Sequence, residues 1–88
     1  MRGVLEAAQA LLQGAKPQVQ DLPRLQEAVR ILESSRPSRE RDALLALAYL
    51  KLYQTVQREE YYLRGYSYAR TSQKEEALAL AERVKGRR

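Results

Sequence analysis

The sequence contains no cysteine and no histidine. Without cysteine there are no disulfides and no thiolate nucleophile, and without either residue the usual zinc sites cannot be built. Histidine is also the commonest general acid–base group. The acidic neighbours Glu59 and Glu60, like Glu75 and Glu76, are adjacent in sequence and so point to different sides of a helix. No phosphate-binding loop or nucleophile motif occurs. We therefore predict no enzymatic activity, no bound metal and no cofactor.

Long apolar runs are also missing. The longest nearly apolar run covers residues 43–50, far short of the roughly 20 residues that span a bilayer. At the N-terminus, Glu6 stands where a signal peptide would have its apolar segment. The sequence therefore predicts a soluble chain with no membrane span, in a cytoplasmic or cytosol-facing location.

The charge of the chain is positive but dispersed. Sixteen basic residues outnumber eleven acidic ones, for a net charge of +5. Only residues 85–88, with Arg87 and Arg88 at the end, form a purely basic run. Basic surfaces attract acidic peptides, nucleic acid or anionic membranes. Because the bases are mixed with acids, a solvated surface is the favoured interpretation and nucleic-acid binding is unlikely.

What the sequence does contain is helical periodicity from end to end. Apolar residues recur at spacings of three and four, as on one face of a helix. Eighty-eight residues leave room for one domain. Short connections make neighbouring helices antiparallel. We predict a single all-α domain, 1–88, of about five antiparallel helices at about residues 2–14, 21–35, 38–54, 57–71 and 73–86.

Helix boundaries are suggested by capping residues. Asp21 and Ser38 are candidate N-caps, and Pro23 suits a first helical turn. Ser72 and Glu75 have the spacing of a capping box. Residues 38–70 contain no proline, and their single glycine lies near the end of this range. An unbroken helix there would be about 50 Å long, so we predict a break at residues 54–57.

One face of the fourth predicted helix carries a distinctive pattern. Tyr61, Gly65 and Tyr68 lie at spacings of four and three, and the small residue Ala77 follows on the next helix. A glycine inside a helix costs about 1 kcal/mol relative to alanine, so we expect another helix to pack closely there. This pattern of aromatic, glycine, tyrosine and alanine resembles a tetratricopeptide repeat. The resemblance implies an array of helical hairpins in which these four residues are structural.

A second resemblance extends over the same region. An apolar helix at residues 25–32, then Arg-Glu-Glu-Tyr-Tyr-Leu at 58–63, with Gly65 and Tyr68, is similar to the mitochondrial fission adaptor family. That family consists of two-repeat cytosolic domains with a C-terminal membrane anchor. No such anchor is present in this chain.

Candidate binding residues follow from the same helix. Tyr62 and Tyr66 fall off the Tyr61–Gly65–Tyr68 face, and tyrosine offers a large contact area with few rotatable bonds. Arg58 and Arg70 could clamp acidic groups of a partner. The alternative is that the six tyrosines fill the core and the arginines are solvated.

Three functional hypotheses remain open. The first is a protein–protein interaction module, an adaptor or chaperone. It would bind a peptide or helix of another polypeptide, which could be acidic, in a groove between helices. The second is a small basic nucleic-acid-binding domain, whose affinity would fall steeply with salt. The third is a self-associating homo-oligomer or an idealised helical scaffold without a ligand.

Overall fold

The computed structural model describes residues 3–86, and these form an all-α fold, as predicted. Arg2, the first residue of the first predicted helix, and the basic residues Arg87 and Arg88 lie outside the described residues. The elements are α1 (Gly3–Gly14), the short 3-10 helix η1 (Val19–Asp21), α2 (Leu22–Glu33), α3 (Arg39–Val56), α4 (Glu59–Ser72) and α5 (Glu75–Gly86).

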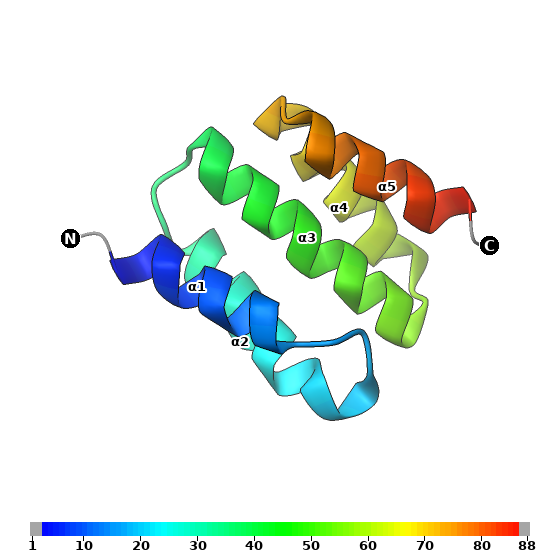
Figure 1. Cartoon of the computed structure of the whole chain (residues 1–88), viewed down its shortest axis with the longest axis horizontal. Coiled ribbons are helices and arrows are strands. Elements are labelled where there is room, and N and C mark those ends of the chain that lie inside the picture. Colours follow the sequence, from blue (N-terminus) through cyan, green and yellow to red (C-terminus); the bar gives the residue numbers. More distant parts are fainter. Residues whose placement is uncertain (1–2, 87–88) are drawn as a thin grey trace.

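The helices form two layers. In Figure 1, α1, α3 and α5 lie in front, with α2 and α4 behind them, and each helix runs antiparallel to the next along the chain. The described chain is 39 × 30 × 18 Å. The shortest dimension suits two layers, because packed helix axes lie 8–10 Å apart. The most extensive contact between helices joins α3 and α4.

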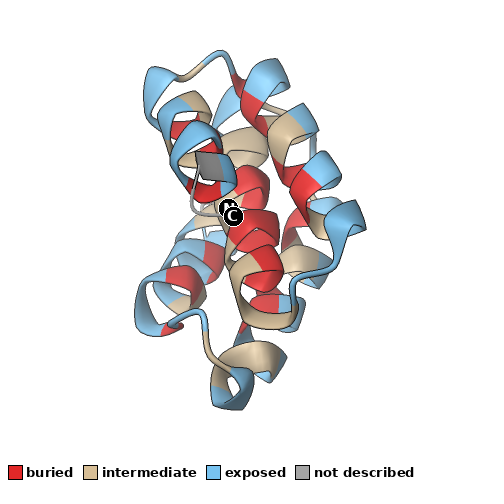
Figure 2. Cartoon of the chain, turned by 90° about the vertical axis from the view of Figure 1, so that its right-hand side faces the viewer, coloured by how far each residue is buried: buried red, intermediate tan, exposed pale blue. Residues whose placement is uncertain are grey.

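Helix α3 lies in the middle and contacts all four other α-helices. Its sequence explains this position, because residues 43–53 are apolar on almost every side. Figure 2 shows the buried residues gathered where the helices face one another and the exposed ones around the outside. The prediction that this segment is central is confirmed.

Both ends of α3 are formed as predicted. At its start, the Ser38 Oγ accepts a hydrogen bond from the Arg41 N–H at 3.0 Å. At its end, Gln57 adopts the left-handed conformation (φ 59°) and its N–H donates to the Tyr53 carbonyl at 2.7 Å. The chain can therefore reverse without glycine or proline, and the predicted break is confirmed.

The cap predicted at Asp21 is wrong. The Asp21 carboxylate accepts from the Lys16 N–H at 2.9 Å and from the Gln18 side-chain amide at 2.8 Å, and makes no capping bond to α2. These bonds lower the pKa of Asp21, the Lys16 N–H having the larger effect. Asp21 thus closes the α1–α2 loop. Pro23 does lie in the first turn of α2, as predicted.

The capping box predicted at Ser72 and Glu75 is wrong as well. Ser72 is the buried last residue of α4, and its hydroxyl donates to the Ala69 carbonyl at 2.7 Å and accepts from the Lys74 N–H at 3.2 Å. Gln73 is left-handed (φ 59°), and α5 begins only at Glu75. The tight turn brings Lys74, rather than Glu75, to the serine.

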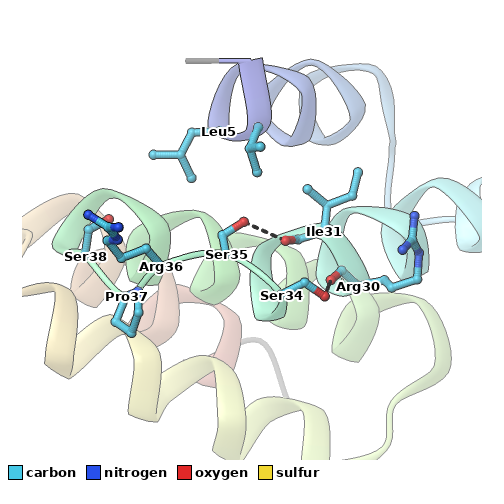
Figure 3. Close-up of a pocket in the computed structure, with 9 residues that line it drawn as sticks. Leu5, Arg30, Ile31, Ser34, Ser35, Arg36, Pro37 and Ser38 are labelled. Carbon is cyan, nitrogen blue, oxygen red and sulfur yellow. Dashed lines mark hydrogen bonds between the residues drawn. The ribbon is translucent and has the colours of Figure 1, made fainter. Parts of the chain in front are cut away.

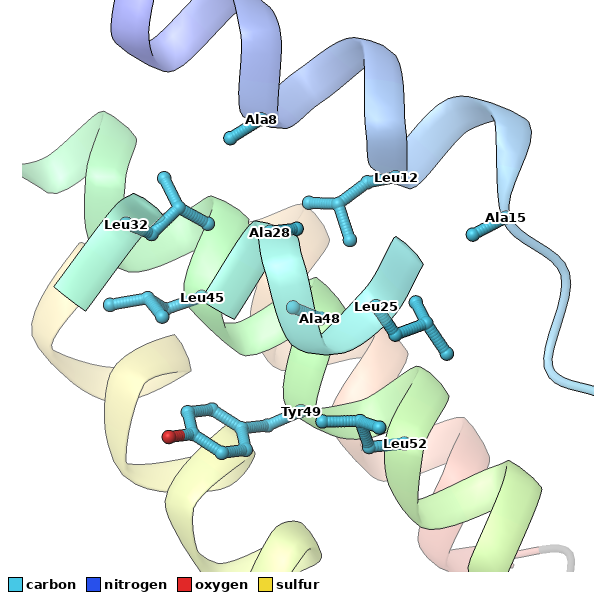
Figure 4. Packing of buried hydrophobic residues seen from close by; sticks show 10 residues of the cluster. All are labelled: Ala8, Leu12, Ala15, Leu25, Ala28, Leu32, Leu45, Ala48, Tyr49 and Leu52. Carbon is cyan, nitrogen blue, oxygen red and sulfur yellow. The ribbon is translucent and has the colours of Figure 1, made fainter. Parts of the chain in front are cut away.

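The larger part of the core is aliphatic. What we call the aliphatic cluster joins α1, α2 and α3, with leucines packed between alanines (Figure 4). Burying a leucine side chain contributes about 1.5–3 kcal/mol, so this cluster supplies much of the stability of the fold. Its buried members are Ala8, Leu12, Ala15, Leu25, Ala28, Leu32, Leu45, Ala48, Tyr49 and Leu52.

The other side of α3 packs against α4 and α5 through tyrosines. What we call the tyrosine cluster has the buried members Leu50, Tyr53, Tyr62, Ala81 and Val84. A smaller group of alanines, Ala46, Ala69 and Ala77, lies where α3, α4 and α5 meet. The three small side chains allow the helices to approach closely.

Gly65 marks the closest approach of α3 and α4. A Cβ at this position would lie 2.9 Å from the Leu50 Cγ and 3.3 Å from the Leu50 backbone nitrogen. The expectation of a tight helix contact at Gly65 is therefore correct. The neighbour, however, is the preceding helix α3 and not α5, so Gly65 does not interlock with Ala77 across the α4–α5 turn.

Lys51 of α3 ties the end of α1 to the centre of the fold. Its ammonium donates to the carbonyls of Leu12 at 2.7 Å and Ala15 at 2.9 Å. The last carbonyls of a helix have no partners within it, so this lysine completes the end of α1. Burial of the side chain lowers the pKa of Lys51.

Candidate functional site

Tyr62, predicted to line a binding groove, is a core residue. Only 6% of it is exposed, its ring lies 5.5 Å from that of Tyr53, and its hydroxyl donates to the Ala81 carbonyl at 3.4 Å. Burial raises its pKa. Helix α5 covers the side of α4 that the sequence pattern left open, so the expectation of an open groove at Tyr62 is corrected.

The other predicted binding residues do not meet at one place. Tyr66 is half-buried and stacks on Tyr62, with ring centroids 6.1 Å apart. Arg58 is exposed immediately before α4, and Arg70 is exposed in its last turn. Twelve residues of helix span about 18 Å. The two arginines are therefore too far apart to clamp one small acidic group.

Tyr61 and Tyr68, assigned structural roles from the sequence, lie against Tyr49 of α3. Their ring centroids are 6.0 and 5.9 Å from that of Tyr49. Ala77, the fourth position of the pattern, is buried beside Ala46 and Ala69. These side chains fill the contacts of α3 with α4 and α5, which leaves little free surface on them for a partner.

Tyr49 also links α3 to α2. Its hydroxyl donates to the Glu33 carboxylate, and the Arg64 guanidinium lies 5.9 Å from the centre of its ring. Burial, followed by the bond to Glu33, raises the pKa of Tyr49 to about 12. Arg41 covers the outer tyrosine of the group, 5.7 Å from the centre of the Tyr68 ring. This arrangement joins three helices.

An open concave site lies elsewhere, between the start of α1, the end of α2 and the link to α3 (Figure 3). We call it the α1–α2 cleft. It has a volume of about 800 Å³. Leu5 lies across it from Ser35 and Pro37, and Ile31 points into it from α2. Its lining residues are Val4, Leu5, Arg30, Ile31, Ser34, Ser35, Arg36, Pro37 and Ser38.

The charge of the cleft is entirely positive. Two of its lining residues are arginines and none is acidic. Arg30 pairs with Glu27 on the same helix, a contact that lowers the pKa of Glu27. Arg36 is exposed and forms no ion pair with any residue from 3 to 86 for which contacts are described. The cleft therefore offers one guanidinium for a carboxylate.

The polar groups of the link are already satisfied. The hydroxyls of Ser34 and Ser35 donate to the Arg30 and Ile31 carbonyls at 2.9 and 2.7 Å. The Ser38 hydroxyl accepts the capping bond of α3. What remains available is the apolar floor and Arg36. This combination suits an aliphatic side chain beside a carboxylate, since arginine binds carboxylates in a forked geometry.

The sequence contained a signal for this cleft that periodicity did not exploit. Val4 and Leu5 are adjacent apolar residues, about 100° apart around a helix, so one can face the core while the other lies at the edge of the apolar stripe. In the structure Val4 is 44% exposed. The cleft combines two stretches that lie far apart in the sequence, residues 4–5 and residues between 30 and 38. The other exposed large hydrophobic residues among those described are Val19, at 70%, and Leu63, at 59%.

Two kinds of feature are absent from the described part of the chain. Within residues 3–86, no helix has both the length and the apolar character needed to cross a membrane. The same residues contain no group of three or more acidic side chains placed to hold a metal ion. The cleft therefore stays the candidate site.

No protein-family model, curated protein or solved structure that we compared with the chain matches it. The resemblances to the tetratricopeptide repeat and to the fission adaptor family therefore stay predictions. The geometry of the described residues is the basis on which a function is proposed.

Proposed function

We propose that the chain is a non-enzymatic protein–protein interaction module, an adaptor or chaperone, that holds a segment of another polypeptide in the α1–α2 cleft. The observation that carries this proposal is the cleft itself, with an apolar floor open to solvent beside the exposed guanidinium of Arg36. Binding sites are usually concave and mostly apolar with a few polar groups, and arginine is enriched among the residues that dominate binding energy at interfaces.

The chemistry of the cleft favours an acidic partner segment. Val4, Leu5 and Ile31 would cover an aliphatic side chain, and Arg36 would pair with a carboxylate next to it. The positive net charge of the chain assists the approach of such a segment. The contact is small compared with the 1,200–2,000 Å² of a stable interface, so we expect weak, reversible binding.

A pair of synthetic peptides tests this proposal. The protein, labelled with nitrogen-15, is titrated with acetyl-Glu-Glu-Leu-Leu-amide and with acetyl-Lys-Lys-Leu-Leu-amide while its amide resonances are recorded. We expect the acidic peptide to shift the resonances of Leu5, Ile31 and Arg36, and the basic peptide to shift them much less.

Two matched charge reversals locate the binding. Arg36→Glu should abolish the shifts, whereas Arg58→Glu, the same charge change at the start of α4, should leave them in place. Both arginines are exposed, so neither change should disturb the fold. Equal losses in the two variants, or equal binding of the two peptides, would show a general charge effect and contradict the proposed site.

A further inference from the structure

The surface of α4 carries an aliphatic side chain beside carboxylates. Leu63 is 59% exposed although it lies within a helix that is packed on two sides. Glu59 and Glu60 are exposed and precede it by four and three residues. A residue three or four positions before Leu63 lies next to it on the helix surface, so the two carboxylates flank Leu63. We call these three residues the Leu63 face, and its chemistry is the one that the α1–α2 cleft suits.

The cleft and the Leu63 face lie at opposite ends of the molecule. Figure 1 shows the link between α2 and α3 at the left end of the longest axis and the turn between α3 and α4 at the right end. Leu63 lies in the second turn of α4, close to that right end. The described chain is 39 Å long. A cleft therefore cannot receive the Leu63 face of its own chain.

We propose that the α1–α2 cleft of one copy receives the Leu63 face of a second copy, so that the chains join head to tail. This inference rests on the binding chemistry proposed for the cleft and names its occupant. Each added copy leaves one cleft and one Leu63 face free. A contact between two different surfaces forms a ring if the rotation between copies closes and an open chain if it does not. Because the two surfaces lie at opposite ends of the long axis, we expect open chains.

The parts of this contact contribute unequally. Pairing covers Val4 and Leu63, two of the three exposed large hydrophobic residues among those described. Glu60 faces Arg36 of the other copy, but it already interacts electrostatically with Arg64 in its own helix. Leu63 therefore supplies most of the attraction, and the charges determine which surfaces meet. Association should weaken only moderately when salt is added.

Sedimentation velocity of the intact chain is the first measurement. With a contact this small, we expect the average mass to rise steadily as the protein concentration increases from about 10 µM to about 1 mM, without stopping at a dimer. A wild-type chain that stays monomeric over this range, or that stops at exactly two copies, overturns the inference.

Two single substitutions separate the two surfaces. Val4→Asp places a carboxylate in the cleft, in the first turn of α1 where the helix dipole tolerates acid. Leu63→Lys removes the aliphatic side chain and substitutes a good helix former. Each variant alone should be monomeric. Val19→Lys, at a site 70% exposed and outside both surfaces, should associate like the wild type.

An equimolar mixture of the two monomeric variants gives the decisive result. Val4→Asp keeps its Leu63 face and Leu63→Lys keeps its cleft, so one functional contact remains between them. We expect dimers that contain one of each and grow no further. If the mixture remains monomeric, the head-to-tail contact is excluded.

The peptide titration distinguishes this failure from that of the proposed function. If Leu63→Lys binds the acidic peptide while the wild type stays monomeric, the cleft takes another protein and only the self-association is wrong. If the wild type neither binds the peptide nor associates, both proposals are wrong.

Discussion

The two sides of α3 are filled in different ways. Toward α1 and α2 the chain packs leucines against alanines, and no tyrosine occurs before Tyr49. Toward α4 and α5 it uses tyrosines, together with Gly65. The aliphatic side buries its members almost completely, whereas Tyr53 and Tyr62 remain 7% and 6% exposed. Apolar packing dominates the first side, where the Tyr49 hydroxyl adds a bond to Glu33 of α2. The second side adds ring contacts between tyrosines and the bond from the Tyr62 hydroxyl to the Ala81 carbonyl.

This difference bears on binding. The sequence predicts that Tyr62 contacts a partner, but in the structure its ring is buried against Tyr53. The surfaces that stay available carry aliphatic side chains, Val4 in the cleft and Leu63 on α4. Substitutions on the two sides of α3 should therefore lower the free energy of unfolding by different amounts.

The largest effect is expected on the aliphatic side. Leu25→Ala removes a completely buried side chain of the aliphatic cluster and should lower the free energy of unfolding by about 2–5 kcal/mol. Leu80→Ala, a half-buried residue beside the tyrosine cluster, should cost less than half as much. Urea unfolding followed by circular dichroism measures both. Equal losses would remove the distinction between the two sides.

The next effect tests the tight contact on the tyrosine side. Gly65→Leu should lower the free energy of unfolding by about 1–3 kcal/mol, because the new side chain collides with Leu50. The control is Gly65→Ala in a Leu50→Ala background, where the two nearest side-chain atoms are gone and only the contact with the backbone nitrogen at 3.3 Å remains, so the change should cost less there than in the wild type. An unchanged melting temperature in Gly65→Leu would contradict the close approach of α3 and α4.

A smaller effect is expected from a single hydroxyl. Tyr62→Phe keeps the ring against Tyr53 and removes the long bond to the Ala81 carbonyl. The loss should be about 1 kcal/mol or less, typical of one hydrogen bond. The midpoint of urea unfolding measures it. A loss several times larger would mean that hydroxyl bonds, and not ring packing, hold α5 in place.

Tyr49→Phe should have the smallest effect on stability at neutral pH, and its effect should grow at alkaline pH. Tyr49 has a pKa of about 12 in the folded protein, against about 10 in an unfolded chain. Its neutral form therefore stabilises the fold below pH 10, and this contribution is lost as the pH rises toward 12. Tyr49→Phe should lose less stability than the wild type between pH 10 and 12. Parallel losses in urea midpoints would contradict the raised pKa.

Periodicity and capping residues predicted the helices well. The central position of α3 and the Ser38 cap follow from local composition, and the break at residues 54–57 follows from the length that an unbroken helix would have. The observed bond from the Lys74 N–H to the Ser72 hydroxyl could not be predicted in the same way. It depends on Gln73 adopting a left-handed conformation, which glutamine does not signal.

The candidate site was much less predictable. Helical spacing shows which residues share a face, but it does not show which helix will cover that face. Tyr62 was misplaced for this reason, since α5 packs over it. The α1–α2 cleft draws on α1, α2 and the link before α3, so no single segment of sequence contains its pattern.

Lys51 has a consequence for the order in which the chain folds during synthesis. Two carbonyls at the end of α1 and just beyond it, those of Leu12 and Ala15, accept hydrogen bonds from a residue 36 to 39 positions later. As the chain leaves the ribosome from its N-terminus, α1 and α2 emerge well before that lysine. Until most of α3 has been made, the first hairpin therefore has only its local bonds at this end, from the Ala15 N–H to the Leu12 carbonyl and from Arg24 to the Gly14 carbonyl.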